Sequence, residues 1–271
     1  MNKVTAKLRI AGLLLCICLS LLMMTGLFVY ANPIDDKASQ LVPWGAPVSS
    51  VTDHDQYLLR TTYAVHYLYR TRTAEYVCEH LTSKAINGKA KRTDDFRPDP
   101  DIPDSVRADL SDYDKEYDRG HLDPADDNTQ SAKIMSECFL LGNIVPQNPH
   151  LNRGLWKKLE TVVRSWVKKG KDLYVVTGTC YGSKYRKIGR DSVGVPMAMW
   201  KVILDRKAGR FIGFMIPNAA VSAKDLPKYA MPISDIAKET GITFFPALPS
   251  NILAEETTAP DPKDWPGLLR K

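Results

Sequence analysis

The sequence predicts an α+β fold with a central, mostly antiparallel sheet flanked by helices. Several segments along the 271 residues have strand composition, whereas only two segments show clear helical periodicity. The chain contains no internal repeat and no flexible linker, and its 44% hydrophobic and 25% charged residues are typical of a globular protein. We therefore expect one folded domain, and the composition excludes a disordered or fibrous chain.

The first 31 residues are typical of an export signal. Residues 1–9 carry three basic residues and no acidic residue, and residues 10–34 carry no charge. A positive start followed by an apolar stretch predicts a signal peptide, here with cleavage after Ala31. The apolar stretch is also long enough to span a bilayer, which takes about 20 residues. We expect a periplasmic or secreted protein, with anchoring in the inner membrane through residues 10–31 as the alternative.

The elements of the sheet can be predicted in order after an irregular arm at residues 32–50. Residues 62–69 place alternate aromatic and apolar side chains on one face, and residues 74–81 continue after a polar break, which predicts a hairpin. Further strands are predicted at residues 173–178, 195–204 and 211–216, and helices at residues 152–169 and 233–240. Residues 254–271 contain several prolines and are expected to form a loose tail.

Three cysteines, Cys78, Cys138 and Cys180, follow the signal segment. None belongs to a CxxC pair or lies near a histidine at metal-ligand spacing, so no zinc site is predicted. Export would allow one disulfide with a third thiol left over. Burial of all three thiols is the alternative.

Charge is distributed unevenly along the chain, which has a net charge of +6. Residues 94–127 hold thirteen acidic and four basic residues, whereas residues 150–190 hold eleven basic and two acidic residues. A basic segment that includes a helix suits a surface that binds a polyanion, with a solvated face as the alternative.

The residues with the clearest chemical meaning are Asp118-Arg119-Gly120-His121 and, thirty-one residues after the histidine, Asn152. At 100° per residue, Asn152 projects within the apolar stripe of its predicted helix, and Glu160 lies at the border of that stripe. A buried amide without a partner costs about 1–3 kcal/mol. Mg²⁺, which prefers oxygen ligands, is one such partner. A hydrogen bond to a buried loop is the alternative, and Pro149 could shift the phase of Asn152.

These motifs resemble the DNA/RNA non-specific endonucleases, which are nucleases of the ββα-metal type. The resemblance depends on the Asp-Arg-Gly-His motif and on the block Asn143-Ile-Val-Pro-Gln147. It depends also on Leu151-Asn-Arg-Gly-Leu-Trp156, which is followed by Leu159-Glu160. Weaker similarity extends from about residue 41 to residue 248. It implies an endonuclease domain at residues 51–253 that hydrolyses DNA and RNA, with Mg²⁺ as cofactor and Mn²⁺ as a substitute.

The resemblance also implies the residues of the reaction centre. His121 is expected to be the general base and Asn152 the direct protein ligand of Mg²⁺, with Glu160 holding the metal through water. Asn143 is expected close to the base. A histidine with a pKa near 6.5 can accept a proton at neutral pH, a step typically worth about 10²- to 10⁴-fold in rate.

Arginines complete the implied site. Arg119 and Arg92 are expected at the phosphate, with Arg97 as the competing alignment for Arg92. Arg164 is expected as a substrate-binding basic residue on the helix that carries Asn152 and Glu160. Arg153 departs from the family pattern and would add positive charge beside the metal. A site that contacts only phosphate and metal carries little information about bases, which agrees with a lack of sequence specificity.

Two other functions are alternatives to this prediction. A catalytically silent nucleic-acid-binding protein of the cell envelope, serving DNA uptake, is one alternative, and a metal phosphodiesterase for small molecules is another. Asp112 begins a calcium-loop pattern, but Tyr117 stands where the loop requires glycine. The histidines at positions 54, 66, 80 and 150 are expected to be structural. The sequence leaves the oligomeric state open, with a homodimer among the alternatives.

Overall fold

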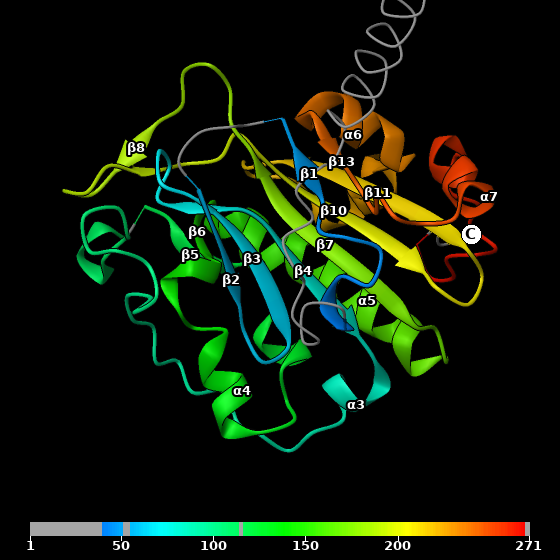
Figure 1. Cartoon of the computed structure of the whole chain (residues 1–271), viewed down its shortest axis with the longest axis horizontal. Helices are drawn as coiled ribbons and strands as arrows, with labels where there is room; N and C mark the ends of the chain where they lie inside the picture. The colour runs from blue at the N-terminus through cyan, green and yellow to red at the C-terminus, as the bar shows by residue number, and fades with distance from the viewer. Residues whose placement is uncertain (1–39, 51–54, 114–115, 269–271) are drawn as a thin grey trace, which may run out of the picture. The chain divides into compact units, whose positions relative to one another are not determined.

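The computed structural model describes residues 40–50, 55–113 and 116–268, and the predicted signal segment lies outside these ranges. The main sheet is antiparallel throughout, in the order β12-β11-β10-β7-β4-β3-β2 (Figure 1). Its strands are β2 (Asp55–Leu59), β3 (Tyr63–Leu68), β4 (Thr73–Leu81), β7 (Leu173–Cys180), β10 (Ala198–Asp205), β11 (Arg210–Pro217) and β12 (Ala230–Met231). The predicted α+β class and the predicted β3–β4 hairpin are both confirmed.

Side-chain alternation gives the sheet two buried faces. On β7, Val175 points into one apolar cluster and Val176 into the other, and on β10 Ile203 and Val202 divide in the same way. The alternation follows from the two-residue period of a strand. The main helix, α5 (Lys157–Lys168), covers the first face, and α6 (Ile233–Thr240) covers the second (Figure 1).

Three short antiparallel pairs are attached to this sheet. They are β1 (Val48–Ser49) with β13 (Ile242–Thr243), β5 (Asp118–His121) with β6 (Ile144–Gln147), and β8 (Lys187–Ile188) with β9 (Val193–Gly194). The first pair shows that the expected irregular arm is ordered at its end, because β1 finds its partner almost 200 residues later in the chain.

The remaining helical elements are short. They are α3 (Ser83–Ile86), α4 (Ala132–Glu137), α7 (Ser250–Leu253) and the 3₁₀ turns Leu110–Asp112, Ala125–Asp127, Leu141–Asn143, Ala223–Tyr229 and Ala254–Thr257. A π-helical segment, Leu151–Trp156, precedes α5 directly. The predicted helix at residues 233–240 is confirmed as α6, and Gly241 ends it in the left-handed region with φ of 70°.

The C-terminal segment is packed, contrary to the loose tail that the sequence predicted. Trp265 is 1% exposed and Leu268 is 6% exposed. The Trp265 ring lies 4.8 Å from the ring of Trp166 on α5, and the Trp166 indole nitrogen donates a hydrogen bond to the carbonyl oxygen of Pro266. The segment therefore forms an ordered covering over Trp166 of α5, with contacts from Trp265 and the carbonyl group of Pro266.

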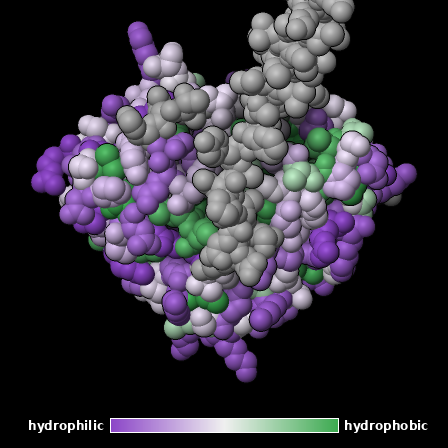
Figure 2. Space-filling model, viewed as in Figure 1, coloured by the Kyte–Doolittle hydropathy of each residue, from purple (hydrophilic) through white to green (hydrophobic). Residues whose placement is uncertain are grey.

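The surface of the described part is largely polar. Figure 2 shows a face that is mostly hydrophilic, with apolar residues in scattered patches. Within the described ranges, no helix combines the length and apolarity needed to cross a membrane. Cys78, Cys138 and Cys180 are free thiols, and the first two are buried.

Candidate active site

The pair β5–β6 and the helix that follows place the predicted catalytic residues. Asp118 pairs with Gln147 and His121 pairs with Ile144. Because alternate residues of a strand point to opposite faces, Arg119 and His121 share one face while Asp118 and Gly120 share the other. Residues 148–150 then lead into the π-helical segment and α5. The succession of two strands and a helix is the ββα arrangement that the family resemblance implied.

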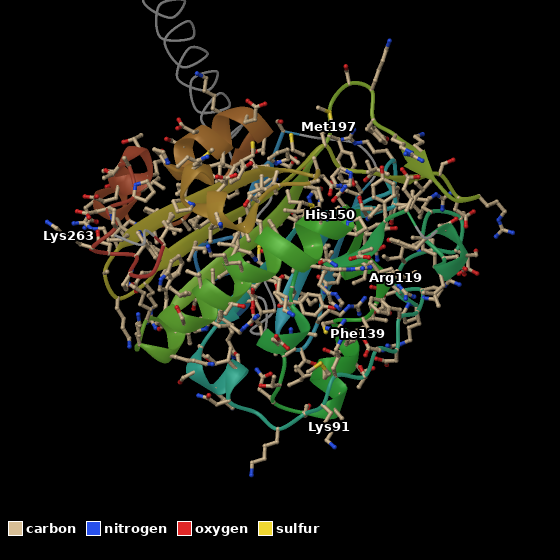
Figure 3. The ribbon with its side chains drawn as sticks, turned by 180° about the vertical axis from the view of Figure 1, so that it is seen from behind. Lys91, Arg119, Phe139, His150, Met197 and Lys263 are labelled. Carbon is tan, nitrogen blue, oxygen red and sulfur yellow. The ribbon has the colours of Figure 1, made fainter. Side chains whose placement is uncertain are left out.

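The His121 ring packs against two phenylalanine rings, which also contact each other with centroids 4.8 Å apart. Its centroid is 4.9 Å from that of Phe139 and 5.4 Å from that of Phe96. A guanidinium group lies over each phenyl ring. The Cζ atom of Arg92 is 4.8 Å from the centroid of Phe139, and that of Arg119 is 4.3 Å from the centroid of Phe96. Figure 3 shows Arg119 and Phe139 in the same region of the molecule. The structure thus brings His121 together with both predicted phosphate-binding arginines.

This environment keeps the His121 ring uncharged. Burial, together with the positive charges of Arg92 and Arg119, lowers the pKa of His121 to about 3. Its Nε2 atom is buried, and no hydrogen-bond partner for it is found among the described residues. The ring therefore offers an unprotonated nitrogen at neutral pH, as a general base requires.

The structure separates the two competing arginines. The guanidinium of Arg97 is held by Asp95 and by the carbonyl oxygen of Ser136, at 2.8 and 3.1 Å. Arg92, by contrast, contacts Asp94 through Nε and reaches the His121 environment with its guanidinium group. The geometry favours Arg92, the alignment preferred from the sequence.

Asn152 is oriented by the first residue of the Asp-Arg-Gly-His motif. Its amide nitrogen Nδ2 donates a hydrogen bond of 2.9 Å to Oδ2 of Asp118. The carbonyl oxygen Oδ1 is thereby directed away from the carboxylate. Arg153 contacts the same carboxylate through Nε and Nη2, but its side chain is 73% exposed. Strand β5 therefore carries both His121 and the residue that orients Asn152. Asp118 and His121 are three residues, about 10 Å, apart along the strand.

The π-helical segment changes which residues share a face with Asn152. The N–H group of Lys157 donates to the carbonyl oxygen of Asn152, five residues earlier. In a regular α-helix, residues eight apart would lie about 80° apart around the axis. The four residue-to-residue steps from Asn152 to Trp156 lie in the π-helical segment and turn by roughly 82° each, and the four steps from Trp156 to Glu160 turn by the regular 100°. The two side chains are therefore only about 10° apart around the axis. Asn152 and Glu160 consequently lie on one face of the helix, more closely aligned than a regular helix predicts.

Glu160 lies in a partly buried, charged environment. Burial raises its pKa to about 7, and Asp127 and Asp126 add to the shift, while Lys201 and Arg164 oppose it. Arg164, one turn later on α5, forms ion pairs with Asp127 at 3.0 Å and with Asp126 at 3.3 Å. Arg164 is therefore committed to these acidic side chains next to Glu160.

Asn143 is fully buried and bonded to backbone atoms. Its Oδ1 accepts a hydrogen bond from the backbone N–H of Asp123, and its Nδ2 donates to the carbonyl oxygens of Asp123 and Cys138. This arrangement fixes the chain immediately after His121. It suits a residue that positions the segment next to His121, close to which the sequence expected Asn143.

Gln147 is a neighbour of the site that sequence reasoning did not select. Its side chain is fully buried, yet neither its Oε1 nor its Nε2 has a hydrogen-bond partner in the described part of the chain. It packs over Gly120, where an added Cβ would lie 2.2 Å from Oε1. Because directly paired residues share a face, Gln147 and Asp118 lie together. The signal in the sequence was the glutamine that ends the Asn-Ile-Val-Pro-Gln block.

The oxygen atoms near Asn152 are suitable ligands for a hydrated hard cation. The described residues contain no group of three His, Cys, Asp or Glu side chains that could enclose a metal ion. They do provide an oriented amide oxygen on Asn152, a carboxylate on the same helix face and the unpartnered amide of Gln147. Mg²⁺ keeps several of its waters and is bound by few protein oxygens, so such a set suits it.

Of the histidines expected to be structural, His66 and His80 pair with acidic side chains, His54 lies outside the described ranges, and His150 does not have the expected packed environment. His66 lies between Glu75 and Asp55, at 2.8 and 2.7 Å. His80 pairs with Asp172 and stacks on a tyrosine ring, whereas His150 is exposed at the start of the π-helical segment (Figure 3). Asp112 is fully buried and accepts hydrogen bonds from two backbone N–H groups, which does not suit a calcium loop.

The chain is similar in sequence to several named nucleases. It is 38% identical over 216 residues to a mitochondrial nuclease EXOG of Danio rerio. That match covers 73% of this chain and 63% of the relative. It is 36% identical over 211 residues to the mitochondrial endonuclease G of Homo sapiens, covering 72% of this chain and 70% of the relative. A nuclease of a Nostoc species is 33% identical over 223 residues, with coverage of 78% and 80%. The chain thus spans less than two thirds of the zebrafish relative.

A solved structure and a family model agree with this similarity. An EndoG chain from the crystal structure of an EndoG/EndoGI complex superimposes with a TM-score of 0.72 at 28% sequence identity. The match covers 80% of this chain and 94% of the other. Residues 44–251 match the family model described as DNA/RNA non-specific endonuclease. On these grounds the chain belongs to the DNA/RNA non-specific endonuclease family.

Proposed function

We propose that this protein is an exported, Mg²⁺-dependent endonuclease that hydrolyses phosphodiester bonds of DNA and RNA without sequence specificity. Family membership supports nucleic-acid cleavage in general. The observation that carries the assignment of the centre is the Nε2 atom of His121, which has no hydrogen-bond partner among the described residues and whose ring packs against two phenylalanine rings that each lie under an arginine. A nitrogen without a proton, next to two fixed positive charges, is suited to activate water beside a phosphate.

In this proposal, Nε2 of His121 takes a proton from the attacking water. Its low pKa follows from burial and from two neighbouring arginines. A phosphate diester brings negative charge against Arg92 and Arg119, which reduces the positive field at the ring and raises the basicity of His121. The base thus becomes a better proton acceptor when substrate is bound.

The two arginines and the helix residues have separate tasks. Arg119 and Arg92 would donate charge-assisted hydrogen bonds to the non-bridging phosphate oxygens and stabilise the charge that develops on them. Oδ1 of Asn152 would hold Mg²⁺ directly, and Glu160 would hold it through water. When bound, the metal supplies Lewis-acid stabilisation to the phosphate and the leaving oxygen.

Cleavage of a supercoiled plasmid tests the proposal. Purified protein with Mg²⁺ should nick and then degrade the plasmid, and a chelator should stop the reaction. His121→Ala and Asn152→Ala should lose most of this activity, whereas Asp235→Asn, on the exposed surface of α6, serves as a matched control. A wild-type protein that cuts neither with Mg²⁺ nor with Mn²⁺ would refute the assignment.

Export is supported by the charge and hydropathy of residues 1–31. Cell fractionation, with mass spectrometry of the mature N-terminus, tests it. Recovery of the protein in the periplasm or medium without residues 1–31 is expected. Recovery of the intact chain in the inner membrane would establish the anchored alternative, and recovery in the cytoplasm would contradict export.

A further inference from the structure

The segment 182–194, here named the basic hairpin, forms a projection built from β8 and β9. It contains four basic side chains, those of Lys184, Arg186, Lys187 and Arg190, and one acidic side chain, that of Asp191. All four basic residues are exposed. Ser192 and Gly189 both have positive φ, at 62° and 68°, which makes the tip a tight turn. Figure 1 shows the hairpin on the same side of the molecule as β5 and β6.

The hairpin has a firm base next to the candidate active site. Ile188 and Val193 are buried, at 5% and 0% exposure, in one apolar cluster with Ile144. Ile144 is the β6 residue that pairs with His121. The backbone N–H of Gly194 also donates to the carbonyl oxygen of Thr71 at 2.8 Å. Apolar contacts and main-chain bonds thus fix the hairpin to the strand pair that carries the general base.

A second contact joins the hairpin to the metal side of the site. Arg186 forms two hydrogen bonds with the carboxylate of Glu116, and its guanidinium lies 5.5 Å from the ring centroid of Tyr117. Tyr117 directly precedes Asp118, whose carboxylate orients Asn152. Arg186 therefore anchors the hairpin and is largely neutralised by Glu116.

The other three cations face solvent. Among the described residues, neither Lys184 nor Lys187 forms an ion pair with an acidic side chain, although the Lys187 ammonium lies 5.7 Å from the ring of Tyr185. Arg190 is 84% exposed and approaches Asp191 only to 3.8 Å. Three cations on a rigid support are therefore available to a polyanion.

We propose that the basic hairpin is a second contact surface for nucleic acid, which binds backbone phosphates several nucleotides away from the bond that is cleaved. This inference rests on the proposed function. It adds a binding surface that makes affinity depend on the length of the substrate. Duplex DNA carries one negative charge per about 1.7 Å of axis, so a rigid cationic hairpin beside the centre meets phosphates of the same duplex. Contacts of this kind raise the affinity for long substrates and read no sequence.

Binding measurements in a chelator separate this inference from catalysis. We would compare His121→Ala protein with the same protein carrying Lys184→Gln, Lys187→Gln and Arg190→Gln. Fluorescence anisotropy would use labelled duplexes of roughly 30 and roughly 8 base pairs over a range of salt concentrations. The control carries Lys207→Gln, Lys238→Gln and Lys263→Gln, which make the same change in net charge at exposed positions outside the hairpin. Lys263 lies at the opposite end of the molecule in Figure 3.

The hairpin variant should bind the long duplex at least about ten-fold more weakly, and its salt slope should fall by roughly 1 per lost phosphate contact. Affinity for the short duplex should change little, and the control should bind both duplexes like the parent. Equal weakening in the control, or equal weakening for both lengths, would overturn the inference. Equal melting temperatures of the parent, the hairpin variant and the control would show that all three proteins are folded. A wild-type protein that fails to cut plasmid would refute the proposed function without affecting this result.

Discussion

The imidazole of His121 meets the ring of Phe139 edge to face, with centroids 4.9 Å apart and planes at 86°. Phe139 is fully buried, so its own position is fixed by the core. Aromatic packing therefore sets the orientation of the proposed general base, while its Nε2 has no hydrogen-bond partner in the described part of the chain. The guanidinium of Arg92 lies over the same phenyl ring, so the proposed base and the proposed phosphate-binding arginine both pack against Phe139.

Replacing Phe139 by leucine should lower kcat more than it changes KM. An edge-to-face aromatic pair contributes about 0.5–1.5 kcal/mol beyond burial, equivalent to roughly 2- to 12-fold in rate if the loss falls on the transition state. Steady-state cleavage of a labelled duplex measures the effect. Phe211→Leu is the matched control, because Phe211 is buried in the other apolar cluster. Equal losses in both variants would mean that stability alone is responsible.

Removing Arg92 should change the pH dependence of cleavage. Arg92 is one of the groups that lower the pKa of His121, so Arg92→Ala should move the acidic limb of the kcat/KM profile toward higher pH. The value of kcat/KM should also fall, because a phosphate contact is lost. Arg97→Ala, whose guanidinium is turned to Asp95, should leave the limb in place. An unshifted limb in Arg92→Ala would count against the electrostatic coupling.

Asp118→Ala should weaken Mg²⁺ activation. Asp118 orients Asn152 through a hydrogen bond of 2.9 Å, and loss of such an outer contact typically costs about 10- to 100-fold in metal affinity. Titration of cleavage against Mg²⁺ measures the activation constant, and saturating metal should restore part of the rate. Asp235→Asn provides the control at an exposed site on α6. An unchanged activation constant in Asp118→Ala would remove Asn152 from its assigned role.

His66 should make the folded state less stable at alkaline pH. Burial alone would lower its pKa, but hydrogen bonds to Glu75 and Asp55 outweigh burial and raise it. This stabilisation is fully present below the unfolded value near 6.5 and is lost as pH rises through the folded pKa. Urea denaturation at several pH values should show this loss in the wild type, and His66→Gln should reduce it. The exposed His150→Gln variant should retain the wild-type slope.

Trp265→Ala should destabilise the domain by about 3–5 kcal/mol, as expected for a large buried aromatic side chain. Trp265 is 1% exposed and packs against Trp166 of α5. The free energy of unfolding from urea titration measures the loss. Lys263→Gln, two residues earlier and exposed, should change it little. A small effect for Trp265→Ala would mean that the C-terminal segment contributes little to the fold.

Long, regular elements could be predicted from the sequence because their side-chain pattern repeats. The β3–β4 hairpin, β7, β11 and α6 lie close to their expected positions. β10 begins at Ala198 instead of residue 195, because Pro196 lacks the N–H group that the ladder needs. β5 was not predicted as a strand, since its Asp-Arg-Gly-His sequence has no apolar alternation and is held in place by β6.

The site was less predictable where it depends on tertiary packing. Motif resemblance selected His121 and Asn152, but the aromatic supports Phe96 and Phe139 come from distant segments and carry no local signal. Helical periodicity also assumed 100° per residue and therefore missed the wide turn that aligns Asn152 with Glu160. The predicted tail was wrong because proline content was given more weight than the apolar side chain of Trp265.

The wide turn at residues 151–156 behaves like a single inserted residue whose effect is absorbed locally. If Gly154 were deleted and the turn became regular, the amide and the carboxylate would be seven residues apart and still within about 20° of each other. Two lengths of this segment can thus present the same pair of side chains on one face of the helix. Sequence alignments across this region should therefore allow a one-residue gap, and the number of residues between the two side chains is a poor guide to whether a distant homologue retains them.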